Sequence, residues 1–143
     1  MTRGSRMADQ AGRAPHVSPY RSVVLVLTGM SVPLWWLALF ASSAFRDRFV
    51  PTTSWPALTP FLLPDLGLAA LTIMCGLHGL GGRLSPLLAG LACGAWVYAT
   101  LWTIGAMFSR DIHAAGVVLM LLATVLVAFC CHGLVSTSRA GVD

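Results

Sequence analysis

Four long stretches of the chain carry no formal charge or only one, and short polar segments separate them. These stretches are residues 22–45, 49–82 with Asp65 as their single charge, 84–109 and 112–138. A helix rises 1.5 Å per residue, so it needs about 20 apolar residues to cross a bilayer. Since all four stretches reach that length, the pattern predicts an all-α integral membrane protein built as a four-helix transmembrane bundle.

Prolines and caps indicate where the helices begin and end. Three prolines exclude a long helix between residues 46 and 60, and Ser85 followed by Pro86 is typical of an N-cap and a first helical position. We therefore expect one four-span membrane domain at residues 21–136, between a disordered tail at 1–20 and a short tail at 137–143. The expected spans are about 22–45, 61–80, 86–108 and 112–135.

The composition agrees with a membrane protein and excludes a nucleic-acid-binding protein. Charged residues make up 10% of the chain and apolar residues 57%, whereas a soluble domain has about 25% charged residues. The basic residues lie only in the expected tails and loops, and no basic cluster alternates with aromatic residues, as nucleic-acid binding would favour. The sequence therefore predicts that the protein lies in a lipid bilayer.

The arginines predict how the bundle is oriented in the cell membrane. Positive charge favours the cytoplasmic side, and the side that holds both termini carries twice as many arginines as the other. Both termini are therefore expected in the cytoplasm. The arginines of that side are Arg3, Arg6, Arg13, Arg21, Arg83 and Arg139, and those of the other side are Arg46, Arg48 and Arg110.

Asp65 is the single charge of the second span, and the helical period places it on a face of small residues. At 100° per residue this face also holds Ala69, Thr72, Gly76 and Gly79. Small residues allow close helix packing in lipid. Asp65 is therefore expected to face the interior of the bundle.

Arg46, Asp65 and His113 come from three different helices and are expected at one level near the outer surface. A carboxylate can orient an imidazole or relay a proton with it, and a guanidinium can hold a phosphate or carboxylate. These three residues are the candidate polar site. A structural interpretation competes with it: Asp65 begins a helix, His113 lies at the membrane interface and Arg46 ends a span.

A second group of candidate residues lies toward the inner surface. Cys75, His78, Cys131 and His132 carry thiol and imidazole groups, which bind soft metals, and two histidines on separate helices can ligate a haem. No CxxC pair accompanies them, as zinc sites commonly require, so packing of buried cysteines is the competing interpretation. The sequence requires no cofactor.

Two features of the third span concern packing. Gly90 and Gly94 form a GxxxG pair, which we expect to pack inside the bundle, with a homodimer contact as the alternative. Tyr98 lies near the middle of the membrane, so its hydroxyl is expected to find a partner on a neighbouring helix.

No nucleotide-binding loop, catalytic triad order or metalloprotease helix is present in the sequence. The leading hypothesis is a non-catalytic accessory or regulatory component that associates with a larger membrane protein or with its own copies. An alternative is a membrane-embedded enzyme or carrier for a lipidic or small substrate, which would use Arg46, Asp65 and His113. A third hypothesis is haem or soft-metal binding at the cysteine and histidine group.

Overall fold

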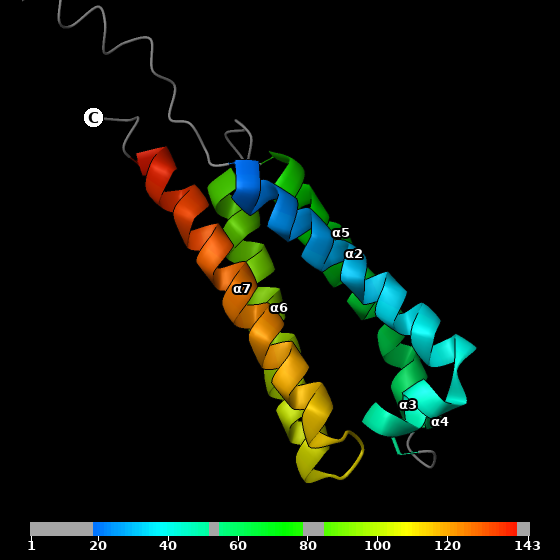
Figure 1. Cartoon of the computed structure of the whole chain (residues 1–143). Coiled ribbons are helices and arrows are strands. Elements are labelled where there is room, and N and C mark those ends of the chain that lie inside the picture. Colours follow the sequence, from blue (N-terminus) through cyan, green and yellow to red (C-terminus); the bar gives the residue numbers. More distant parts are fainter. Residues whose placement is uncertain (1–18, 52–54, 79–84, 140–143) are drawn as a thin grey trace, which may run out of the picture.

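The computed structural model describes residues 19–51, 55–78 and 85–139 (Figure 1). Residues 1–18 of the tail expected at 1–20, residues 140–143 of the tail expected at 137–143, and Gly79 lie outside the described residues. The described residues of both expected tails are helical, so these tails are shorter than expected. In chain order the elements are α2 (Pro19–Ala41), α3 (Ser43–Phe49), α4 (Trp55–Leu58), the short 3-10 helix η2 (Thr59–Phe61), α5 (Leu62–His78), α6 (Ser85–Phe108) and α7 (Ala114–Arg139).

Four helical segments of the described part are long and apolar enough to cross a membrane. They are Pro19–Ala41, Trp55–His78, Pro86–Phe108 and Ala114–Gly133. The prediction of an all-helical chain with four such segments is confirmed. Their bounds differ from those expected: the first ends at Ala41 and not at residue 45, and the second begins at Trp55 and not at residue 61.

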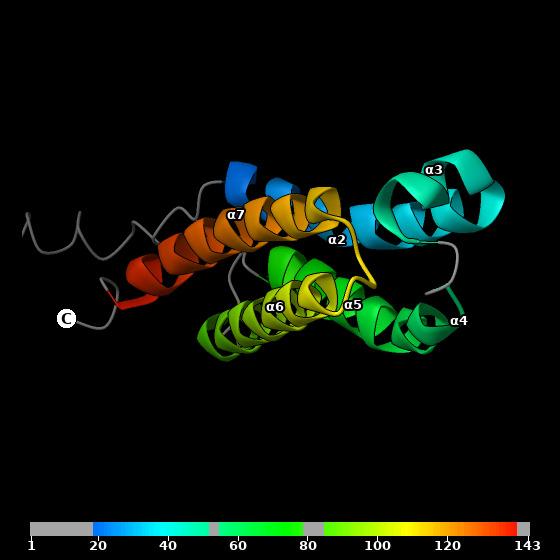
Figure 2. The ribbon, with the colours of Figure 1, turned by 90° about the horizontal axis from the view of Figure 1, so that it is seen from below.

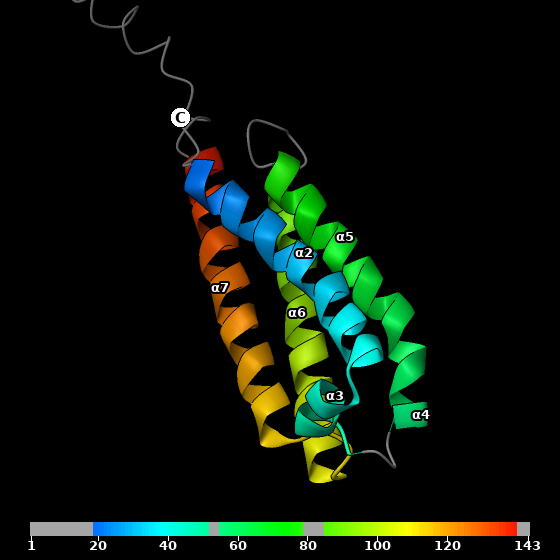
Figure 3. The ribbon, with the colours of Figure 1, turned by 45° about the vertical axis from the view of Figure 1, so that its right-hand side comes forward.

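The first span ends early because Ser42 starts a new helix. Its backbone is extended, and its hydroxyl accepts a hydrogen bond from the Phe45 amide at 3.2 Å, which caps α3. Arg46 therefore belongs to α3, and the interpretation that it ends the first span is wrong. Figure 3 shows α3 folded back toward the start of α7, where the His113 amide donates to the Phe49 carbonyl oxygen at 2.9 Å.

The helices pack as two pairs, α2 along α5 and α6 along α7. Figure 1 shows that the pairs converge where α2 begins and α7 ends, and diverge toward α3, α4 and the turn between α6 and α7. These are called the narrow end and the wide end below. Figure 2, seen from the wide end, shows α2 over α5 and α7 over α6.

Glycines bring α2 and α5 into close contact. A Cβ added at Gly76 would lie 2.8 Å from the Ser22 carbonyl oxygen, and one at Gly29 would lie 2.9 Å from the Ala69 carbonyl oxygen. Ala69, Gly76 and the neighbouring Thr72 are buried. The small-residue face expected on the second span is therefore the face that packs in the bundle.

The GxxxG pair of the third span does not pack in the bundle. A Cβ at Gly90 or Gly94 would meet no atom within 4 Å, and both residues are exposed. The adjacent face of α6, with Ala89, Ala92 and Trp96, is buried instead. The expectation of an internal contact at Gly90 and Gly94 is therefore wrong, because the larger Trp96 sets which face of α6 turns inward.

Hydrogen bonds from buried and half-buried side chains connect the helices across the core. The Trp96 indole donates to the Thr72 hydroxyl at 2.9 Å and so joins α6 to α5. Thr124 of α7 shares a hydrogen bond of 2.6 Å with Thr100 and donates to the Trp96 carbonyl oxygen at 3.3 Å. Buried polar groups are costly unless paired, so these contacts favour one register of the helices.

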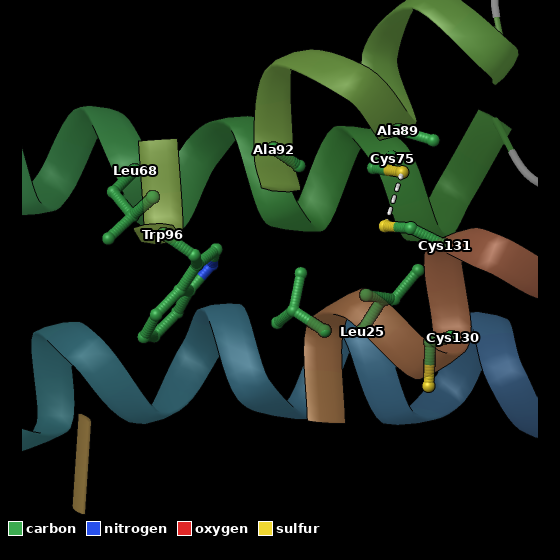
Figure 4. Close-up of a cluster of buried hydrophobic side chains, with 9 residues drawn as sticks. Leu25, Leu68, Cys75, Ala89, Ala92, Trp96, Cys130 and Cys131 are labelled. Carbon is green, nitrogen blue, oxygen red and sulfur yellow. Dashed lines mark hydrogen bonds between the residues drawn. The ribbon is translucent and has the colours of Figure 1, made fainter. Parts of the chain in front are cut away.

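The narrow end holds the two pairs together. Cys75 and Cys131 lie with their sulfur atoms 3.9 Å apart, next to Leu25 and Cys130 (Figure 4). Arg21 of α2 reaches across to α7, where its guanidinium lies 5.6 Å from the centre of the Phe129 ring.

Candidate functional site: an aromatic cavity between the helix pairs

A cavity of about 470 Å³ lies between the two helix pairs, toward the wide end. Its walls come from both pairs and from α3, α4 and η2, and they are mostly apolar. The sequence holds five tryptophans, and all five line this cavity. They are Trp35, Trp36, Trp55, Trp96 and Trp102.

Two contacts bridge the pairs at the wide end and limit the opening of the cavity. The ring centres of Phe61 and Trp102 lie 3.9 Å apart, which joins η2 to α6. On the other side, the hydrogen bond between Phe49 and His113 joins α3 to α7. At the wide end of the bundle, where the helix pairs diverge, aromatic rings and backbone therefore bound the cavity.

Asp65 supplies the carboxylate of the cavity. It lies in the first turn of α5, is half-buried and lines the cavity wall. Its Oδ2 accepts a hydrogen bond of 2.8 Å from the indole nitrogen of Trp36, which is 5% exposed. The first turn of a helix favours a carboxylate, as the structural interpretation held. Because Asp65 also lines the cavity, its carboxylate is placed to contact a ligand there as well.

The three members of the expected polar site are not joined to one another in the described part of the chain. The Arg46 guanidinium lies 5.0 Å from the centre of the Trp55 ring, and its buried Nε has no hydrogen-bond partner. His113 is exposed and precedes α7, which begins at Ala114. Of the three, only Asp65 lines the cavity.

Some of the other polar side chains that line the cavity have hydrogen-bond partners within the described segments, and one has none there. The hydroxyls of Ser31 and Thr103 donate to carbonyl oxygens of their own helices, at 2.7 Å each. Tyr98 lines the cavity but is 73% exposed, and no hydrogen bond to its hydroxyl is found within the described segments. The expected partner on a neighbouring helix is therefore absent there, because the Tyr98 side chain is largely exposed.

The structure brings together only part of the cysteine and histidine group. Cys75 and Cys131 are buried and adjacent, whereas His78 and His132 are exposed. The His78 ring lies 3.0 Å from the Met74 carbonyl oxygen of its own helix. Within residues 19–51, 55–78 and 85–139, no three His, Cys, Asp or Glu side chains are arranged to hold a metal ion.

The aromatic lining is the part of the site that the sequence reasoning missed. The chain does hold the adjacent pair Trp35 and Trp36, and Trp96 and Trp102 on its third span, but the helical period does not place the last two on one face. Tryptophans in membrane proteins are commonly found at the interface, so the sequence alone did not indicate that these rings line one cavity.

The hydrogen bond to Asp65 can be tested by replacing Trp36. We expect Trp36→Phe to lower the free energy of unfolding by about 1–2 kcal/mol, because a carboxylate in a half-buried site loses its donor. Trp35→Phe is the matched control, since the Trp35 ring packs on Phe45 and Phe49 without such a bond. Unfolding in mixed detergent micelles, followed by circular dichroism, measures both. Equal losses would show that the bond contributes nothing.

No family model, no curated protein and no solved structure matches this chain.

Proposed function

We propose that this chain is a membrane-embedded binding protein or carrier for a small amphiphile. The cavity carries the proposal: about 470 Å³, lined by five tryptophans and containing one carboxylate. Sites for small ligands commonly measure about 300–1,000 Å³ and combine apolar walls with a few placed polar groups. The apolar part of the ligand lies among the rings, and its polar part contacts Asp65.

The position of the cavity supports an amphiphile as the occupant. The helices around it are long and apolar enough to cross a membrane, so the molecules that surround the opening are lipids and other membrane-soluble compounds. Among the described residues, only the Trp36 indole donates a hydrogen bond to Asp65. A ligand with a donor group supplies a second hydrogen bond to this carboxylate. A purely apolar ligand leaves that carboxylate without a second donor.

We further propose that the chain lies in the cell membrane with both termini in the cytoplasm. The support is the excess of arginines on the side of the termini. The wide end then faces outward, and the ligand enters from the outer leaflet. A topology reporter fused to each terminus checks this orientation, and an external signal from either fusion contradicts it.

Binding is tested with 11-bromoundecanol, an amphiphile whose bromine quenches indole fluorescence on contact. We expect saturable quenching of the purified protein in detergent, because all five tryptophans line the proposed site. Partition into the micelle alone gives quenching that rises steadily with the mole fraction of the probe. Quenching of that second kind only would overturn the proposal.

A role as an accessory component of a larger membrane protein is the second candidate. The supporting observation is the face of α6 with Gly90, Gly94 and Gly105, where an added Cβ would meet no atom within 4 Å. Such a face lets another helix approach closely. Purification in mild detergent tests this role, and a protein that is always recovered alone contradicts it.

A further inference from the structure

We infer that the ligand of this cavity is a hydrophobic cation: a quaternary or protonated amine, or a comparable onium group, joined to an apolar body. The inference rests on the proposed function and names the class of its ligand. It combines three features of the site as the described residues form it. These are the aromatic walls, a carboxylate to which no cationic side chain bonds, and a lining without a basic residue.

The aromatic walls favour a positive charge. The face of an indole ring is electron-rich and attracts a cation within about 6 Å of its centre, most strongly where water is excluded. The Trp36 indole donates to Asp65, and the centre of the Trp55 ring lies 6.1 Å from that of Trp36. A cation that reaches the carboxylate meets the N–H edge of Trp36, so the ring faces that it can contact are those of the less buried lining residues Trp35, Trp55 and Trp102.

The Asp65 carboxylate has no ionic partner within the described residues. A half-buried carboxylate at membrane depth is costly without a counter-charge, and its one hydrogen bond comes from a neutral indole. Arg46 and His113, the cationic groups expected near it, make no bond to it. The ligand itself can supply the positive charge that the protein does not place there.

The composition of the lining disfavours an anionic ligand of similar shape. No Arg, Lys or His of the described segments lines the cavity, so an anion would meet the Asp65 charge and the negative faces of the rings. Arg46 is not part of the lining and lies against the Trp55 ring. That contact is a cation–π interaction between the Trp55 ring and a cation of the protein itself.

Three probes of nearly equal shape separate charge from hydrophobicity: the cation tetraphenylphosphonium, the neutral tetraphenylsilane and the anion tetraphenylborate. The purified full-length protein in detergent is titrated with each, followed by tryptophan fluorescence, with empty micelles as the blank. We expect the cation to bind about tenfold more tightly than the neutral probe, which corresponds to about 1.4 kcal/mol. The anion is expected to bind more weakly than both.

The variant Asp65→Asn assigns the preference to the carboxylate. It keeps the side-chain volume and removes the charge, so the preference for the cation is expected to fall to that of the rings alone, about two- to fivefold. Asp47→Asn removes an equal charge from α3, outside the cavity lining, and is expected to keep the full preference. Circular dichroism verifies that both variants are folded.

The outcomes distinguish the two proposals. If the three probes and bromoundecanol all fail to bind saturably, the proposed binding function fails, and the inference fails with it. If the probes bind with equal affinity, or the anion binds best, the binding function stands and the cation inference is overturned. A cation preference that survives unchanged in Asp65→Asn overturns the role of the carboxylate.

Discussion

Replacing Gly76 by leucine is expected to force α2 and α5 apart and to lower the free energy of unfolding by about 3 kcal/mol or more. Even the first carbon of the new side chain would lie 2.8 Å from the Ser22 carbonyl oxygen and 2.9 Å from a methyl group of Val26. The Ser22 oxygen belongs to the backbone, so rotation of a side chain cannot relieve the clash. Unfolding in mixed micelles, followed by circular dichroism, measures the loss.

The same replacement at Gly94 is the matched control. Gly94 also lies within a membrane-length helix, but an added Cβ there meets nothing within 4 Å. We expect Gly94→Leu to change the unfolding free energy by no more than about 0.5 kcal/mol, as exposed substitutions usually do. If the two variants lose equal stability, the packing of α2 against α5 through Gly76 is not as the structure has it.

The second large effect is expected on ligand binding, from Gly67→Phe. Gly67 lines the cavity, and an added Cβ meets nothing within 4 Å, so a phenyl ring has room to enter the space that the ligand requires. We expect the affinity for 11-bromoundecanol and tetraphenylphosphonium to fall by about tenfold or more, because the filled volume is no longer available. Stability is expected to stay equal or rise, since helical glycine is less favourable than most residues.

Gly105→Phe is the control for this effect. Gly105 is equally open and exposed, yet it does not line the cavity. The variant is expected to bind both probes as the unchanged protein does. Loss of binding in both variants would point to a general disturbance of the bundle, and retention in both would show that the ligand does not occupy the cavity.

The length and period of the apolar stretches were sufficient to predict the helices and one of their buried faces. Four apolar stretches became four membrane-length helices, because length and hydropathy are properties of each segment alone. The small-residue face through Ala69 and Gly76 was predicted for the same reason, since helical geometry fixes which residues share a face.

The arrangement between segments could not be predicted from these local rules. Arg46 was expected at the end of the first span. The cap at Ser42 starts a new helix before Arg46, so Arg46 lies in α3. Gly90 and Gly94 were expected to pack, yet the contact of Trp96 with Thr72 turned another face of α6 inward. The cavity depends on the angle between two helix pairs, which no single segment encodes.

The helix pairs converge beside Cys75 and Cys131 and diverge at the wide end, where the contacts of Phe61 with Trp102 and of Phe49 with His113 bridge them. A helix of 24 residues, the length of α6, is about 36 Å long, so a rotation of about 5° at one end displaces the other by roughly 3 Å. A small change of the angle beside Cys75 and Cys131 is therefore amplified at the wide end, where the two bridging contacts oppose it.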